Sequence, residues 1–120
     1  MGSDFVIEKI TGKENTTLVK FGNQLLGGND ALNLISKLNG LASKRIKFVV
    51  ADLSKVEIIN SSGLGMLVSA LTTLKKYEIE FLLCCVPEKV QKLLEMTHLN
   101  KIFRTFESKE KALIYLEKLD

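Results

Sequence analysis

A short polar segment ahead of a predicted helix holds the residues best suited to chemistry. It spans positions 60–65 and reads NSSGLG, and the apolar residues after it recur every three or four positions up to Leu74, which predicts a helix. A helix N-terminus presents free N–H groups and a partial positive charge, so it accepts phosphate. No Asp or Glu lies between Asn60 and Lys76, although acidic residues are favoured in a first turn. The segment is therefore a candidate phosphorylation site.

Two interpretations of this segment are open. In the functional interpretation, phosphorylation of a serine adds a charge of about −1.5 to −2. The domain stays folded, and the charge acts on the partner that binds at this surface. The small flanking residues would let a partner backbone come close. In the structural one, Asn60, Ser61 or Ser62 caps the helix, and the glycines at 63 and 65 allow tight packing of helix against strand.

Enzymatic uses of these serines have little support in the sequence. A hydrolase would need a base beside Ser61 or Ser62, and the only histidine is His98, at the expected end of a later helix. The chain has no G-x-S-x-G motif. Positions 63–65 lack the spaced glycines and the Lys-Ser/Thr ending of a phosphate-binding loop. We therefore expect no catalytic residue, no cofactor and no enzymatic activity.

The two cysteines, Cys84 and Cys85, are adjacent in an apolar run. Neighbouring residues of a strand point to opposite faces, so a disulfide between them would be strained. The sequence has no C-x-x-C motif and no set of partners for a zinc site. We expect two reduced cysteines that act as small hydrophobic residues, and no metal.

Apolar patterns along the chain predict the elements that position the serines. Strands are expected at 5–10, 16–21, 46–53, 79–86 and 103–106, with a turn at 12–15 that makes the first two a hairpin, and a short apolar pair stands at 58–59. The first helix is expected to end at about Leu41, with Asn29 or Asp30 as its cap, and the second to span 64–76. A third helix is expected to have Pro87 in its first turn, and a fourth to follow Ser108 as its cap.

This order predicts an α/β fold of about five strands and four helices. Strands that alternate with helices after residue 28 imply crossover connections and a mostly parallel sheet, to which the N-terminal hairpin adds an antiparallel strand. We expect the docking surface at the end of the sheet where segment 60–65 lies, joined by the loop 22–30.

Length and composition fit this fold and exclude several classes of protein. The chain has 120 residues, enough for one domain, which we place at 4–119 after setting aside Met1 to Ser3. Apolar residues make up 46% and charged residues 26%, which excludes a disordered tail. The net charge of +3 is too weak to indicate nucleic acid binding. No apolar run approaches the roughly 20 residues of a membrane span and no signal peptide opens the chain, so we expect a cytoplasmic protein without membrane contact.

The segment 49–56 (VVADLSKV), the pair 58–59 and the NSSGLG segment together resemble the signature of STAS domains, and most of all that of the bacterial anti-sigma factor antagonists. The resemblance extends from the first hairpin to the strand at 103–106 and its helix, and implies a STAS fold. In that family the serine just before the glycine is phosphorylated by a partner that is both anti-sigma factor and serine kinase, and Ser62 matches it here. The unphosphorylated protein binds that partner and frees a sigma factor, and a phosphoserine phosphatase reverses the modification.

The resemblance implies a partner-binding surface around the phosphorylated serine. Besides Ser62, the residues expected there are Asn60, Ser61, Gly63, Leu64, Gly65 and Asp30. Two positions depart from the family, which commonly has Asp at the place of Asn60 and an acidic residue in the loop after the second strand, where only Asp30 is available. The alternative is a STAS module that acts on a non-sigma partner, such as a transporter, a lipid-trafficking complex or a signalling enzyme.

Overall fold

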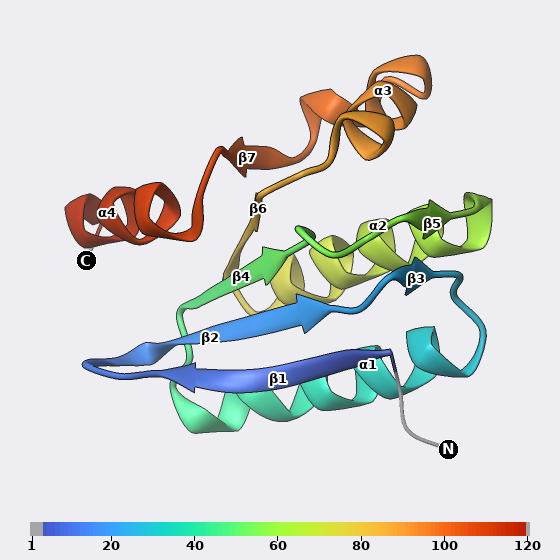
Figure 1. Cartoon of the computed structure of the whole chain (residues 1–120). Coiled ribbons are helices and arrows are strands. Elements are labelled where there is room, and N and C mark those ends of the chain that lie inside the picture. The colour runs from blue at the N-terminus through green and yellow to red at the C-terminus, as the bar shows by residue number, and fades with distance from the viewer. Residues whose placement is uncertain (1–3, 120) are drawn as a thin grey trace.

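The chain forms a mixed five-stranded sheet whose strand order is β1-β2-β4-β6-β7 (Figure 1). The computed structural model describes residues 4–119. The strands are β1 (Phe5–Ile10), β2 (Lys13–Phe21), β4 (Phe48–Asp52), β6 (Glu80–Cys84) and β7 (Arg104–Phe106). β1 is antiparallel to β2, and every other neighbouring pair in this sheet is parallel. A second, two-stranded parallel sheet joins β3 (Gln24–Leu25) to β5 (Ile58–Ile59).

Helices connect the strands and cover the sheet. They are α1 (Asn29–Leu41), α2 (Ser61–Lys76), α3 (Glu88–Met96) and α4 (Lys109–Leu119), with short 3₁₀ turns at η1 (Ala42–Lys44) and η2 (Leu99–Lys101). Helices α1, α2 and α3 contribute to the larger apolar core, whereas α4 packs alone against the opposite side of the sheet (Figure 1). No helix within the described residues is long and apolar enough to cross a membrane.

The central strand β4 shows how the sequence pattern produces this layered core. Its residues from Phe48 to Ala51 are all buried, because the strand is covered on both faces. Alternate side chains enter different layers: Val49 and Ala51 belong to the larger core, and Phe48 and Val50 to the smaller one beneath α4. The expected α/β class with a mostly parallel sheet is confirmed.

Several expected boundaries were wrong because the chain turns where few residues signal it. The hairpin turn is tighter than expected, so β2 already begins at Lys13. Neither Asn29 nor Asp30 caps α1; the N-cap is Gly28, at φ 65°, without a side-chain hydrogen bond. This left-handed backbone region suits glycine and ends the preceding loop. Pro87 is the N-cap of α3 and not part of its first turn.

The predicted cap of the last helix is confirmed. The backbone N–H of Lys111 donates to Ser108 Oγ over 3.1 Å. The predicted start of α2 was too late: the helix begins at Ser61, so both serines are helical and Asn60 alone precedes them.

Candidate functional site

The N-terminus of α2 is closed by Asn60, which decides among the three candidate caps. Asn60 Oδ1 accepts a hydrogen bond of 2.7 Å from the N–H of Gly63, and its carbonyl accepts one of 2.9 Å from Leu64. Ser61 and Ser62 are therefore the first two helical residues, and both are exposed. Because the first turn contains no acidic residue, the partial positive charge of this helix end is not offset by a carboxylate within it.

Two glycines let the loop after β3 lie directly against this turn. Gly63 is buried, and a Cβ atom there would overlap the backbone carbonyl of Leu25. Gly27 has φ +82°, and its Cβ would lie 2.9 Å from that of Ser62. The N–H of Asn60 also donates to the carbonyl of Leu25 over 3.4 Å. Segments 22–30 and 60–65, which the sequence predicted to adjoin, are thus packed together (Figure 1).

Asp30 helps to fix the loop 22–30 through hydrogen bonds. Its Oδ2 accepts a hydrogen bond from the N–H of Asp4 over 3.1 Å, and the Asp4 carboxylate in turn accepts one from the N–H of Gln24 over 2.8 Å. Asp30 is half-buried, so it joins the start of α1 to the start of β1 and to β3. In this structure it supports the loop, and a contact of Asp30 with a partner stays a prediction.

The remaining predicted residues differ in their exposure. Leu64 is only 6% exposed and belongs to the larger core, so it anchors the turn. Gly65 is exposed, and no heavy atom lies within 4 Å of the place where its Cβ would be. The two glycines that the sequence presents as a pair thus have different surroundings: Gly63 packs on backbone, and Gly65 faces open space.

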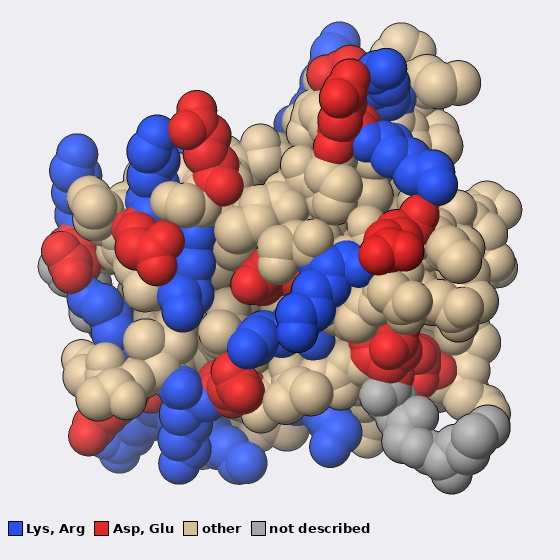
Figure 2. Space-filling view, viewed as in Figure 1, with Lys and Arg blue, Asp and Glu red and all other residues tan. Residues whose placement is uncertain are grey.

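Exposed apolar side chains occur in the segments that flank this turn, which was not predicted from the sequence. Leu26 is 39% exposed beside the turn, and Ile58 in β5 is 46% exposed. A shallow groove of about 690 Å³ runs beside β5 and is lined by Ile59, Glu88, Lys89, Lys92, Leu93 and Met96. In Figure 2 the outermost right-hand edge of the molecule, beyond β3 and β5, is mostly uncharged, and acidic side chains lie just inside it. In the sequence the pair 58–59 is indistinguishable from core, because only the strand pairing decides which residue faces outward.

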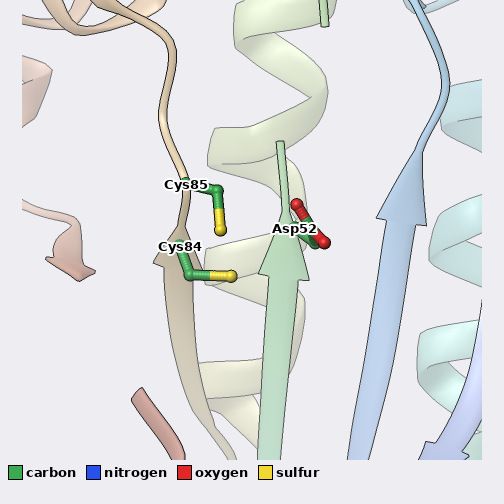
Figure 3. Close-up of side chains that lie close together, drawn as sticks. All are labelled: Asp52, Cys84 and Cys85. Carbon is green, nitrogen blue, oxygen red and sulfur yellow. The ribbon is translucent and has the colours of Figure 1, made fainter. Parts of the chain in front are cut away.

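The cysteines do not point to opposite faces, which corrects the sequence-based expectation. β6 ends at Cys84, and Cys85 follows in the left-handed region at φ 59°, where the alternation of a strand no longer applies. Both sulfurs are directed towards the neighbouring strand that carries Asp52 (Figure 3). Burial raises the pKa of the Cys84 thiol, and its hydrogen bond with Cys85 and the nearby charges raise it further. Both cysteines are free thiols in this structure.

Comparison with known proteins identifies the family. The sequence profile of the STAS domain matches residues 8–112. The chain belongs to the STAS domain family. The fold is similar to the anti-sigma factor antagonist SpoIIAA in its unphosphorylated form, with TM-score 0.77, 15% identity, and 95% of this chain and 96% of that chain covered. It is also similar to a serine-to-glutamate variant of Moorella thermoacetica RsbS, with TM-score 0.80, 18% identity, and 98% and 97% covered.

A third similar structure comes from another functional setting. It is a sulfate transporter family protein of Wolinella succinogenes, with TM-score 0.72, 17% identity, and 88% of this chain and 87% of that chain covered. At these identities the likeness establishes the STAS fold, which antagonists and a transporter-family protein share.

Proposed function

We propose that this STAS protein is an anti-sigma factor antagonist whose binding is switched by phosphorylation of Ser62. The unphosphorylated surface formed by segments 22–30 and 60–65 binds an anti-sigma factor that is also a serine kinase, and a sigma factor is released. Phosphorylation of the Ser62 hydroxyl separates the two proteins, and a phosphoserine phosphatase restores the hydroxyl. In this scheme the chain is a substrate and not an enzyme, and it acts in the cytoplasm without nucleic acid, membrane or cofactor.

The observation that carries the proposal is the exposed hydroxyl of Ser62 in the first turn of α2. A phosphate there is favoured by the helix dipole and meets no acidic residue within that turn, so the domain can stay folded when modified. Gly27, which has no side chain, lies directly against Ser62. The added charge therefore acts on whatever protein covers this surface.

Binding measurements on Ser62 variants test the switch. The partner is first recovered by pull-down with the wild-type chain, and a purified anti-sigma factor is then titrated by calorimetry. Ser62→Ala should bind as wild type does. Ser62→Asp should fold but lose about 2–5 kcal/mol of binding free energy, because its carboxylate is desolvated and unpaired in the complex. Wild-type affinity of a Ser62→Asp protein with a normal thermal melt would contradict the proposal.

The kinase step has a matched control in the neighbouring serine. Ser61 is also exposed and lies one residue earlier in the same turn. Incubation with the kinase and labelled ATP should label wild-type protein and Ser61→Ala, and leave Ser62→Ala unlabelled. Labelling that disappears with Ser61→Ala instead would place the modification on the other hydroxyl.

A second candidate function is a STAS module that acts on a non-sigma partner. The likeness to the sulfate transporter family protein favours it, because the same fold occurs in a protein of that family. The two candidates differ in their output. Addition of the wild-type chain to an anti-sigma factor bound to its sigma factor should release the sigma factor if the first candidate holds, and should release none if the second does.

A further inference from the structure

Asp52, Cys84 and Cys85 bring three potential metal ligands together at the carboxyl ends of β4 and β6 (Figure 3). One carboxylate oxygen and the two sulfurs all lie within 4.8 Å of one another. Asp52 and Cys84 are direct neighbours in the parallel register of the two strands, so their side chains leave the sheet on the same face. Cys85 follows in the left-handed region, which turns its sulfur back towards this pair.

We propose that these three residues bind one Zn²⁺ ion, with water in the fourth position. Zinc takes thiolate and carboxylate ligands in tetrahedral sites, and three protein ligands plus water is one of its common arrangements. Zinc–sulfur bonds of about 2.3 Å place two thiolates about 3.8 Å apart. From separations within 4.8 Å, the two sulfurs need to approach by no more than roughly 1 Å to reach this geometry. Binding releases the thiol protons.

The surrounding backbone holds these ligands in place. Asp52 Oδ1 accepts a hydrogen bond of 2.9 Å from the N–H of Ser54, which orients the carboxylate and leaves further lone pairs for a metal. The Cys84 carbonyl accepts one of 3.1 Å from Leu53, and the N–H of Cys85 donates one of 3.0 Å to Phe106. The two strand ends that carry the ligands are thus linked to each other and to β7.

The three residues differ in their burial. Cys84 is fully buried under α4, whereas Cys85 and Asp52 are half-buried. An open hollow of about 340 Å³ is lined by Cys85, Val86, Gln91, Thr105, Phe106 and Glu107. Of the three proposed ligands, Cys85 is the one that borders this hollow. Cys84 belongs to the smaller core beneath α4, whereas α2 packs in the larger core, so this proposal does not rest on the function proposed for Ser62.

Zinc fits this pair of thiols better than a disulfide does. The Cα atoms of adjacent residues lie about 3.8 Å apart across a trans peptide, which is shorter than the roughly 4.4 Å minimum usual for disulfide-bonded cysteines. A metal ion tolerates the short Cα–Cα distance, because two metal–sulfur bonds separate the sulfurs in place of a single S–S bond. The hard cations Mg²⁺ and Ca²⁺ take oxygen ligands, so the two sulfurs select against them.

Zinc titration of the reduced chain tests the site. Zn²⁺ alone is titrated in competition with a chromophoric chelator, with a non-thiol reductant present to keep the cysteines reduced. The wild-type chain should bind one equivalent. Cys85→Ser and Asp52→Asn should each weaken binding at least tenfold, since each removes a ligand. Both positions are half-buried, so these variants are expected to fold, and a thermal melt without zinc checks this.

His98→Ala is the matched control, because it removes the only imidazole of the chain and leaves the three proposed ligands intact. It should bind zinc as wild type does. Absence of a one-equivalent zinc complex in the wild-type chain would overturn the proposal. Unchanged affinity in Cys85→Ser or in Asp52→Asn, or loss of affinity in His98→Ala, would also overturn it, because the ion would then be held elsewhere or by other groups.

Discussion

The start of α2 and the end of β6 both carry reactive side chains at the carboxyl edge of parallel strands, but different backbone features position them. At the start of α2, Asn60 bonds the N–H of a residue three positions later, and Gly63 lets the helix rest on the loop after β3. At the end of β6, one residue, Cys85, adopts a left-handed backbone and so brings its sulfur beside that of Cys84.

The difference shows which side-chain positions can be predicted from a sequence. A cap and its hydrogen-bond donor are close in the chain, and their residue types are typical, so the pattern NSSGLG already indicates a helix start. Cysteine is not typical of left-handed positions, and nothing in the run around Cys84 and Cys85 marks the change of dihedral angle. Substitutions that change the backbone contacts or the dihedral-angle preference in each region test this contrast.

The largest effect is expected from Gly63→Ala. The added methyl group would overlap the Leu25 carbonyl, which is backbone fixed by the pairing of β3 with β5. We expect a loss of about 3 kcal/mol or more in the free energy of unfolding, since helix and loop must separate. Urea unfolding followed by circular dichroism measures it.

Gly65→Ala is the matched control for that change. Its methyl group would meet no heavy atom within 4 Å, and alanine favours a helix over glycine by about 0.5–1 kcal/mol. We expect a small gain in stability from the same assay. Similar losses in both variants would mean that α2 does not pack on Leu25 as described.

Gly27→Ala should have the next largest effect. Position 27 has φ +82°, which costs an L-residue roughly 1–2 kcal/mol, and the new Cβ would lie 2.9 Å from that of Ser62. We expect a loss of about 2 kcal/mol in unfolding free energy, measured by urea titration. Gly28→Ala separates the two causes, because position 28 also has a positive φ but no neighbour within 4 Å. An equal loss in both would assign the whole effect to backbone strain.

The contact of Gly27 with Ser62 is an example of a feature that could not be predicted from the sequence. Strands β4 and β6 were predictable because their apolar runs are continuous, and the place of Ser62 at a helix start because of the pattern around it. β3 was missed because two residues carry no periodicity, and its loop is far from α2 in the chain. The exposure of Leu26 and the clustering of Asp52 with the cysteines were missed for the same reason: each depends on pairing between distant segments.

Asn60→Ala should cost about 1 kcal/mol of unfolding free energy, the usual effect of removing an N-cap side chain. The hydrogen bond to the Gly63 N–H would be lost, while the backbone bond from Leu64 would stay. Asn60→Asp keeps an acceptor at the same place and adds a charge that the helix dipole favours, so it should be at least as stable as wild type. Thermal melts of the three proteins check this order, and equal melting of Asn60→Ala and wild type would show that the cap contributes little.

The smallest effect, and the one specific to the end of β6, is a reversed preference between glycine and alanine at position 85. In ordinary helix or strand interiors alanine is more stable than glycine by about 0.5–1 kcal/mol, because glycine loses more chain entropy on folding. At φ 59° an L-residue is strained by roughly 1–2 kcal/mol, which glycine relieves. Cys85→Gly should therefore be more stable than Cys85→Ala by up to about 1 kcal/mol in urea unfolding, both variants lacking the thiol. If Cys85→Ala were the more stable of the two, the backbone at 85 would be extended, its side chain would alternate with that of Cys84, and the two regions would follow the same local rule.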